Sequence, residues 1–461
     1  MGFASEKVKE YFRRHLRQGK YTNEIIQQIE QSDILRNMCS NPLFCATLAS
    51  SPEFHQPQRE EQTTMPVINH TQVLFDYVTL LLQECGYDRN TAHKCLREVG
   101  ELAYKGIKRN KLSFEADALK ELNTCPDNFT TVFMFHDPDK HSSGTIYEFR
   151  HYVIRDFLAA LTHVLNSPMS QLKRILDEKF MDTQGNFRTF LLFLVGLSSR
   201  KSTNRLKLEL DSVRSDVTLC ISEWLTESVN RRLTNMYGKY TQIMFLHTLY
   251  CLLEFGDNII MKKVLSPIAK IKLNHLLLTV VDCAVLSRTL IYSEVIEELN
   301  LSSCLAQPGV LQKLEPVLYR CLILRLNHNN LQDSGVKRLF NILKRSDCKI
   351  QILELKSNNL TNECLDTLFS ALSTNNSLTE LNLSNSSQER TQANEFTREK
   401  LQNLLDSWPL HKQISTLLQL VHITLQARIV VLILHLDNNL VDGHKFSHSV
   451  YRFIIEINDR D

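Results

Sequence analysis

Residues 321–376, CLILRLNHNNLQDSGVKRLFNILKRSDCKIQILELKSNNLTNECLDTLFSALSTNN, contain one pattern twice. The pattern Leu-x-Leu-x-x-Asn-x-Leu begins at Leu324 and begins again 29 residues later at Leu353. Its alternating leucines predict a short strand whose apolar side chains face a core. The two asparagines, Asn329 and Asn358, have side chains that can hydrogen-bond backbone groups of the turn after each strand. The stretch therefore predicts two copies of one strand-and-turn unit.

A helical period follows each predicted strand at the same offset. Apolar residues at i, i+3, i+4 and i+7 start at Val336 in the first copy and at Leu365 in the second. One strand and one helix per period is typical of leucine-rich repeats. A single unit cannot cover its own apolar stripe, so neighbouring units must stack into a solenoid. The agreement of apolar positions, asparagines and offset favours this interpretation over a chance pair of leucine-rich helices.

Weaker copies extend the predicted repeats over residues 276–410. One copy starts at Leu299, with Cys in the asparagine position, and another starts at Leu278. Downstream, a copy starts at Leu381, and its predicted helix is displaced to residues 401–408. We expect four to five repeats, of which two are regular.

The composition indicates a mostly helical globular chain of 461 residues. Glycine is scarce, with 13 residues, and the apolar fraction of 43% is ordinary for a globular protein. This length predicts two to four domains. Basic and acidic residues nearly balance, at 53 and 51, so nucleic-acid binding is not favoured. Binding of a polyanion at a local patch stays open.

Twelve cysteines occur without any Cys-x-x-Cys pair. Several lie at predicted apolar positions, and no two have the spacing of zinc ligands. The N-terminal residues MGFASEKVKEYF lack the apolar core of a secretory signal. We therefore expect buried, reduced thiols in a cytoplasmic protein, and no metal site.

One apolar segment, residues 414–436, approaches the length of a membrane-spanning helix. It contains Arg428 near its centre and several other polar side chains. A central arginine costs about 2.5–3.5 kcal/mol on insertion scales. We therefore predict no membrane span, and assign residues 411–461 to an atypical C-terminal tail.

Residues 1–50 are predicted to be a helical segment. Ser5 is expected to cap the first helix, and a second helix is expected over residues 22–37. Pro42 fits the first turn of a third, buried helix, because that turn does not use the donor that proline lacks.

Residues 51–165 are predicted to form a winged-helix domain, which opens on a proline-containing loop at 51–66. Helices, a hairpin and a further helix follow in that order. Some winged helices bind DNA, but these helices are not especially basic, so DNA binding is not favoured. Residues 166–275 predict a second domain of packed helices. The expected elements of the winged helix are helices at 70–86, 90–106 and 115–123, strands at 131–136 and 145–151, and a helix burying Ile154, Phe157, Leu158, Leu161 and Leu165.

Four features, in this order, resemble the C-terminal portion of a NACHT–leucine-rich-repeat receptor, also called a NOD-like receptor. GFASEKVKEYFRRHL, residues 2–16, resembles the first helix after the nucleotide-binding core. MCSNPLFC, residues 38–45, is similar to the family's proline-containing helix. TIYEFRHYVIRDFLAAL, residues 145–161, is similar to the motif Phe-x-His-x-Ser/Thr-x-Gln-Glu-Phe-x-Ala-Ala. The leucine-rich repeats complete the order. The implied fold is mostly α with a winged-helix region, followed by a short α/β leucine-rich-repeat solenoid.

The resemblance implies two nucleotide contacts. Pro42 matches the proline that packs on the adenine, and His151 matches the histidine that contacts the terminal phosphate of ADP. An imidazole N–H beside a phosphate forms a charge-assisted hydrogen bond. The motif departs from the family at Val153, in the Ser/Thr place, and at Arg155 and Asp156, in place of Gln-Glu. Purely structural roles are the alternative: Pro42 would start a helix, and His151 would hydrogen-bond to a neighbouring residue.

No Gly-x-x-x-x-Gly-Lys-Ser/Thr motif occurs in the sequence, and no acidic run ends an apolar strand as a Walker B segment would. A lone proline and histidine, without a phosphate cradle and a Mg²⁺ ligand, cannot hold ATP. We therefore expect no cofactor in this chain, with ATP or ADP bound in full-length relatives. Pro42 and His151 are cofactor contacts only where a nucleotide-binding core is supplied. We expect a truncated member, either a partial gene model or a short form that modulates full-length relatives.

The sequence predicts an interaction protein and not an enzyme. No Gly-x-Ser-x-Gly elbow and no carboxylate pair supports catalysis. The resemblance implies cytosolic innate immune sensing and inflammasome-like assembly through protein partners. The alternative is a stand-alone leucine-rich-repeat scaffold, or a modulator of an unrelated protein, that binds on its exposed strand positions. The predicted contacts at those positions are Arg325, Asn327, Glu354 and Lys356.

Overall fold

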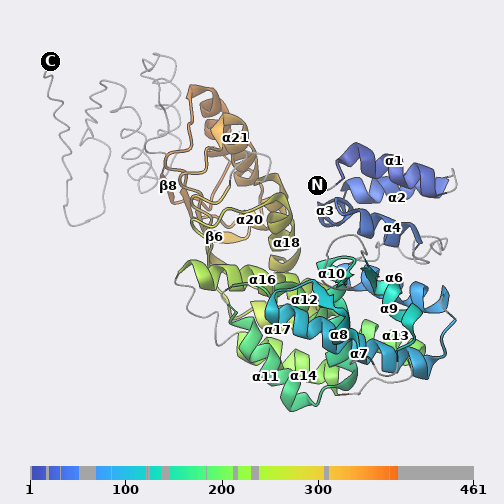
Figure 1. Ribbon diagram of the computed structural model, residues 1–461. Helices are drawn as coiled ribbons and strands as arrows, with labels where there is room; N and C mark the ends of the chain where they lie inside the picture. The colour runs from blue at the N-terminus through green and yellow to red at the C-terminus, as the bar shows by residue number, and fades with distance from the viewer. Residues whose placement is uncertain are drawn as a thin grey trace, which may run out of the picture. The chain divides into compact units, whose positions relative to one another are not determined.

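The computed structural model describes residues 3–382, apart from the gaps given at the end of this paragraph. The chain divides into two compact units, Met1–Ile296 and Glu297–Asp461, and each is described by itself. Helices predominate in the first unit, and a parallel sheet organises the second (Figure 1). The residues outside the description are 1–2, 17–19, 32, 51–68, 85, 121, 123–124, 137–145, 183, 211–215, 230–237, 306–310, 373 and 383–461.

The first unit opens with four short helices. Pro42 is the first residue of α4, as its sequence context predicts. The prediction that Ser5 caps the first helix is wrong, because Ala4 has the extended cap conformation and its carbonyl accepts the first helical bond, from Val8. The single helix predicted over 22–37 is instead two helices. The four are α1 Ser5–His15, α2 Lys20–Gln31, α3 Asp33–Cys39 and α4 Pro42–Ser50.

A small antiparallel sheet of order β1-β3-β2 follows in the same unit. The strand predicted over 131–136 is shorter, because Phe129 and Phe133 bury their rings from one helical face before the strand begins. A strand not predicted from sequence pairs with the other edge of β3, with Phe114 opposite Tyr147. The elements are α6 His70–Glu84, α7 Arg89–Arg109, β1 Ser113–Glu115, α8 Ala116–Leu119, α9 Asp127–Phe133, β2 Met134–His136 and β3 Ile146–Phe149.

Helix α10, Tyr152–Asn166, runs through the core of this unit and is buried along almost its whole length. It packs against α7 and against α12, Arg188–Leu197. Close approach to α7 depends on Gly100, since a Cβ there would lie 1.9 Å from the Thr162 hydroxyl oxygen. All five apolar residues predicted to share the buried face of this helix are buried: Ile154, Phe157, Leu158, Leu161 and Leu165.

Packed helices complete the unit, as predicted for residues 166–275. The repeat predicted to start at Leu278 is wrong, because Thr279 and Asp282 form a capping box that starts a helix at Val280. The short strand of this region lies upstream instead. These elements are α11 Met169–Phe180, α13 Arg200–Leu210, α14 Val217–Trp224, a π-helix Leu225–Val229, α16 Lys239–Phe255, α17 Asn258–Leu265, β4 Lys270–Lys272 and α18 Val280–Leu290.

In the second unit, β5, β6, β7 and β8 lie in chain order in one sheet (Figure 1). Leu324 pairs with Leu353, and Leu353 pairs with Leu381, in parallel register. Helices return the chain between strands, and the apolar stripes of α21 and α22 include the buried Val336 and Leu368. The bounds are β5 Ile296–Asn300, a 3-10 helix Gln312–Leu314, α20 Glu315–Leu318, β6 Cys321–Arg325, α21 Gln332–Leu343, β7 Ile352–Glu354, a 3-10 helix Asn362–Cys364, α22 Leu365–Leu372 and β8 Glu380–Asn382.

The predicted strand-and-helix pattern of residues 321–372 is therefore confirmed. The helix predicted at 401–408, the segment 414–436 and the tail at 411–461 lie outside the described residues.

Two buried asparagines connect successive turns after the strands. The Asn358 side-chain oxygen accepts from the backbone N–H groups of Asn329 and Leu331, at 3.2 and 3.3 Å. Its amide nitrogen donates to the carbonyls of Leu326 and Leu355, at 2.9 and 2.8 Å. Asn329 repeats this arrangement one turn upstream. Each asparagine thus satisfies backbone groups of two successive units at once.

We expect Asn358→Ala to lower the free energy of unfolding by about 3 kcal/mol, because several buried backbone groups lose a hydrogen-bond partner and an unsatisfied buried group costs about 1–3 kcal/mol. Chemical denaturation of the whole chain measures this. The matched control is Asn341→Ala, an exposed position on α21, which should change stability by less than about 0.5 kcal/mol. Equal effects of the two substitutions would contradict the role of Asn358.

Candidate functional site

The structure brings the segment of Pro42 beside His151, across 110 residues of sequence. His151 is the N-cap of α10, where its Nδ1 accepts from the backbone N–H of Val153 at 3.2 Å. The side-chain nitrogen of Asn41 lies 3.3 Å from Nε2 of His151. Pro42 is exposed and His151 is half-buried. Both residues therefore have a local structural role, as helix start and helix cap, and both reach the surface.

The second ring nitrogen of His151 has no acceptor in these contacts. Because Nδ1 accepts a hydrogen bond, the neutral ring carries its proton on Nε2. The Asn41 amide nitrogen opposite is also a donor, since its oxygen accepts from the Leu43 N–H at 3.0 Å. Burial lowers the pKa of His151, which favours this neutral form. An Nε2–H donor is thus presented beside the start of α4.

One turn further along α10 from His151 lies a buried ion pair that was not predicted from the sequence. Arg155 and Asp156 are adjacent in sequence, and their side chains are 2.8 Å apart. Arg155 also donates to the Lys111 carbonyl at 2.9 Å, which connects α10 to the start of the small sheet. Burial raises the pKa of Asp156 to about 6, although Arg155 opposes the shift. The positions that depart from the family motif are therefore structural in this chain.

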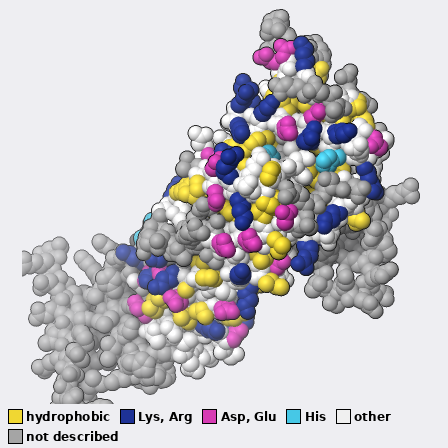
Figure 2. Space-filling model, turned by 90° about the horizontal axis from the view of Figure 1, so that it is seen from below, with side chains coloured by type: hydrophobic (Ala, Val, Ile, Leu, Met, Phe, Trp, Pro, Cys, Tyr) yellow, Lys and Arg dark blue, Asp and Glu magenta, His cyan; other side chains and the backbone are white. Residues whose placement is uncertain are grey.

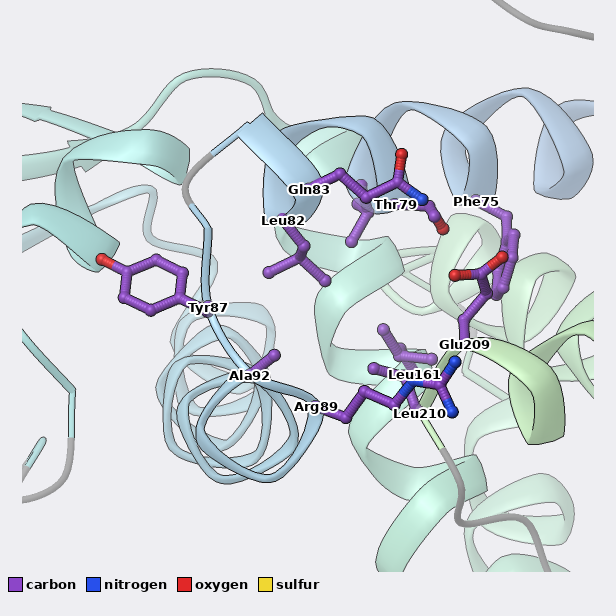
Figure 3. Close-up of a pocket in the computed structure, with 11 residues that line it drawn as sticks. Phe75, Thr79, Leu82, Gln83, Tyr87, Arg89, Ala92, Leu161, Glu209 and Leu210 are labelled. Atoms are coloured by element: carbon purple, nitrogen blue, oxygen red, sulfur yellow. The ribbon is translucent and has the colours of Figure 1, made fainter.

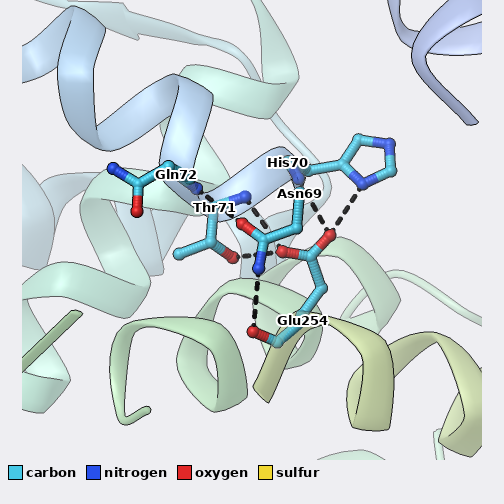
Figure 4. A network of polar contacts seen from close by, with 5 residues as sticks. All are labelled: Asn69, His70, Thr71, Gln72 and Glu254. Carbon is cyan, nitrogen blue, oxygen red and sulfur yellow. Dashed lines mark hydrogen bonds and ion pairs between the residues drawn. The ribbon is translucent and has the colours of Figure 1, made fainter. Parts of the chain in front are cut away.

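Glu254, near the end of α16, is buried and binds the first turn of α6 (Figure 4). One carboxylate oxygen accepts from the backbone N–H and Nδ1 of His70, at 2.9 and 2.8 Å. The other oxygen accepts from the backbone N–H and hydroxyl of Thr71, at 3.0 and 2.7 Å. Asn69 donates to the Glu254 carbonyl at 3.0 Å and caps Gln72. A single carboxylate thus satisfies the start of a helix 184 residues earlier in the chain.

The hydrogen bonds to Glu254 outweigh the cost of its burial. Burial is the largest single influence and favours the neutral acid, but bonds from His70 and Thr71 together hold the pKa below its ordinary value of 4.5. A carboxyl group whose pKa is lower in the folded state stabilises the fold above its unfolded pKa. That contribution is lost as pH falls through the folded-state pKa.

We expect Glu254→Gln to destabilise the chain by about 3 kcal/mol at pH 7, because the new amide nitrogen opposes groups that already donate. Thermal or chemical unfolding at several pH values measures this. The difference from wild type should narrow as pH falls below about 4.5, where the carboxyl group of the unfolded chain takes up a proton while folded Glu254 is still ionised. Glu178→Gln, at an exposed site on α11, is the control and should change the free energy of unfolding very little. A pH-independent difference would contradict the ionised state of Glu254.

In the second unit, the four predicted contact residues lie together, with Arg325 on β6, Glu354 on β7, and Asn327 and Lys356 in the turns after these strands. Arg325 donates to Glu298 at 3.0 Å and also forms an ion pair with Glu354. Asn327 donates to Glu354 at 2.7 Å, and its side-chain oxygen accepts from the Lys356 backbone N–H at 2.9 Å. The structure therefore joins the predicted residues into one polar strip across β5, β6 and β7.

The strip is less exposed than expected. The Arg325 side chain is 31% exposed and that of Glu354 only 16%, because they bond to each other across the sheet. Glu298 was not predicted, since its role depends on its neighbour across strands and not on its own sequence context. Lys356 makes no side-chain hydrogen bond or ion pair within the part of the chain that is described. Its ammonium group is the available charge of the strip.

A cavity of about 270 Å³ lies among α6, α7, α10 and α13. Figure 3 shows Arg89 of α7 and Glu209 of α13 at its margin, with Leu161 and Leu210 close by. Arg89 is exposed and Glu209 is half-buried, so solvent can satisfy both charges. Nothing in this cavity requires a ligand.

The surface drawn in Figure 2 has basic and acidic side chains interspersed, without a region of one sign. Among the described residues, no helix is both long and apolar enough to cross a membrane. No group of three or more His, Cys, Asp or Glu side chains suited to a metal ion was found in the described part of the chain. The eleven cysteines with a described environment form no disulfide with one another, and all but Cys125 are buried, as predicted.

These observations define a mostly helical protein with a strand-and-helix unit and a half-buried polar strip. Residues 151–263 match the family model described as NLRC4 helical domain HD2. The chain is 25% identical, over 354 residues, to the NACHT, LRR and PYD domains-containing protein 1 homolog of Danio rerio, covering 72% of this chain and 25% of the relative. It is 22% identical, over 441 residues, to the NACHT, LRR and PYD domains-containing protein 3 of Bos taurus, covering 83% and 42%.

A third relative, the NACHT, LRR and PYD domains-containing protein 13 of Homo sapiens, is 24% identical over 417 residues, with coverage of 83% and 39%. The chain is therefore similar, over 72–83% of its length, to proteins that carry NACHT and LRR domains. It spans between 25% and 42% of the length of these three relatives.

Proposed function

We propose that the chain acts in the cytoplasm in innate immune sensing and inflammasome-like assembly, through protein–protein interaction and without catalysis. The observation that carries this proposal is the polar strip of Glu298, Arg325, Asn327, Glu354 and Lys356, built across three parallel strands. A half-buried strip with one available charge suits a partner protein better than a substrate, because it offers a row of fixed polar groups and no enclosed reaction site. The similarity to proteins with NACHT and LRR domains supports the same assignment.

We further propose that the second unit is a leucine-rich-repeat segment and that the region around β1, β2 and β3 is a winged helix. The repeat assignment is supported by one strand and one helix per period and by the bonds of Asn329 and Asn358. The winged-helix assignment is supported by the three-stranded antiparallel sheet placed between helices.

We also propose that Pro42 and His151 contact nucleotide only when a nucleotide-binding core accompanies them. The Nε2–H of His151 is a suitable donor for a phosphate oxygen. One donor and one proline ring give little affinity without backbone amides and a metal ion around the phosphates.

Titration of this chain with ADP and Mg²⁺ should therefore show no saturable binding in the micromolar range. Isothermal titration calorimetry measures this, with His151→Ala as the matched variant. If the helix-capping bond to Val153 is its main role, the variant should lose up to about 1 kcal/mol of stability without any change in the ADP titration. Saturable ADP binding that depends on His151 would contradict this part of the proposal.

The strand face is tested by reversing its available charge. Lys356→Glu should weaken binding of partners at this face roughly tenfold, because a charge that guides a partner becomes repulsive. Proximity labelling in cells, followed by affinity measurement with each purified partner, gives the readout. Lys344→Glu makes the same charge change at an exposed position in the same unit and should leave these partners unaffected. Equal loss in both variants, or no loss in either, would contradict a binding role for the strand face.

The alternative function is a stand-alone leucine-rich-repeat scaffold for an unrelated protein. It is distinguished by changes in the first unit, such as Leu208→Asp and Leu219→Asp, which alter side chains that are 69% and 63% exposed. Receptor-like assembly requires contacts of the helical region, so these substitutions should reduce association with full-length relatives. If every partner depends on the strand face and none on the helical region, the scaffold function is favoured.

A further inference from the structure

The first unit contains a second, larger cavity of about 390 Å³, a size typical of small-molecule sites. It lies where the starts of α6, α13 and α17 meet the ends of α16 and α18. Part of its wall is apolar, formed by Leu253, Phe255, Met261 and Ile291. The network of Figure 4 forms another part of the wall, through Asn69, Gln72 and Glu254. The cavity therefore combines an apolar side with a polar side.

The polar side contains an arginine without an anionic partner. Arg288 is half-buried on α18, and among the described residues no carboxylate lies within ion-pair distance of its guanidinium group. A guanidinium group stays charged in a protein and offers five donors in a fixed plane. Withdrawing such a charge from water is unfavourable unless an anion or strong acceptors replace the solvent. A cavity wall with this property favours binding of an anion.

The carboxylate that lines this cavity, Glu254, already has hydrogen-bond partners. Both oxygens of Glu254 accept two hydrogen bonds each from the first turn of α6, so this carboxylate has little capacity left for Arg288. It neutralises the positive end of α6 and leaves the cavity with an uncompensated cation.

Other lining groups also present donors. Ser199 donates to the Ser202 hydroxyl oxygen at 3.0 Å, which leaves the Ser202 hydroxyl hydrogen without an acceptor in the described structure. Tyr292 donates to the Asn258 side-chain oxygen at 2.8 Å, so the Asn258 amide nitrogen is also available to donate. These donors and Arg288 line the same cavity. The cavity therefore offers several hydrogen-bond donors to an anionic group.

We propose that this cavity binds a small organic anion, with a phosphate or carboxylate group on Arg288, Ser202 and Asn258 and an apolar body against Phe255, Met261 and Ile291. Planar guanidinium groups bind both kinds of oxyanion through paired hydrogen bonds. The volume exceeds that of an inorganic anion alone, and the apolar wall supplies the remaining contact. The site is separate from Pro42 and His151 and does not depend on the function proposed for the strand face.

The probes are phenyl phosphate and benzoate, which share an apolar ring and differ in the anionic group, with phenol as the uncharged control. Calorimetric titration of the whole chain should show saturable binding of at least one of the two anions and none of phenol at the same concentrations. The anion that binds with the higher affinity identifies the class of ligand, phosphate or carboxylate. Arg288→Gln should lower the affinity for that anion at least tenfold. Arg288→Lys should lower the affinity less, because lysine keeps the positive charge and loses only the planar guanidinium group.

Two controls separate binding from folding. Arg174→Gln removes an arginine whose side chain is 70% exposed on α11, away from this cavity, and should leave the affinity within twofold of wild type. Arg288→Gln should not lower the melting temperature of the unliganded chain, because it removes a charge that has no ionic partner in the described structure. A large loss of stability would show that Arg288 is structural and would overturn the proposal.

The proposal is also overturned if neither anion binds, or if both bind Arg288→Gln and wild type equally. A competing occupant is an acidic segment of a partner protein. A glutamate-rich peptide that binds in an Arg288-dependent way, with no binding of either small anion, would assign the cavity to that occupant and reject the small-molecule ligand.

Discussion

The first unit depends on the carboxylate of Glu254. This group lies at the end of α16 and supplies the acceptors that the first turn of α6 lacks, although the two helices are far apart in sequence. The first N–H groups of any helix have no partner within the helix, and burying them unsatisfied is costly. Helix α6 can therefore begin inside the protein only because α16 ends beside it. Gly196 allows the same approach from α12, since a Cβ there would lie 2.1 Å from the Thr71 hydroxyl oxygen.

The second unit solves the same problem with amide side chains. Asn329 and Asn358 are neutral, and each both donates and accepts, so that one residue type serves carbonyls and N–H groups of consecutive turns. A carboxylate at position 358 could only accept, and it would remove the hydrogen bonds that Asn358 donates to the carbonyls of Leu326 and Leu355. The period of 29 residues in the sequence is the spacing at which such an amide meets the preceding turn. This is why asparagine recurs at that position in a repeating strand-and-helix unit.

The difference between these two solutions explains what sequence reasoning found. The repeat of Leu324 and Leu353 was predictable because leucine alternation, helical period and asparagine position are all local and occur twice. The bond between Glu254 and Thr71 was not, because a single glutamate in an apolar helix gives no sign of a partner 183 residues away. At Leu278 the local pattern misled, since buried positions such as Cys283 and Val285 suit both a repeat and the helix that a capping box starts there. Pro42 and His151 came from family resemblance, and the structure adds that Asn41, next to Pro42, lies against His151.

The saturation of Glu254 also determines the charge of its surroundings. A buried carboxylate with one free oxygen would pair with the nearest cation, and Arg288 lines the same cavity. Because four donors already occupy Glu254, the cavity keeps a cation whose partner must come from elsewhere. The group that allows α6 to begin inside the protein is thus also the group that leaves Arg288 unpaired in the described structure. An anion bound at Arg288 would share the cavity with Asn69 and Gln72, at the start of α6. Its binding would therefore be coupled to the helix start that Glu254 holds in place.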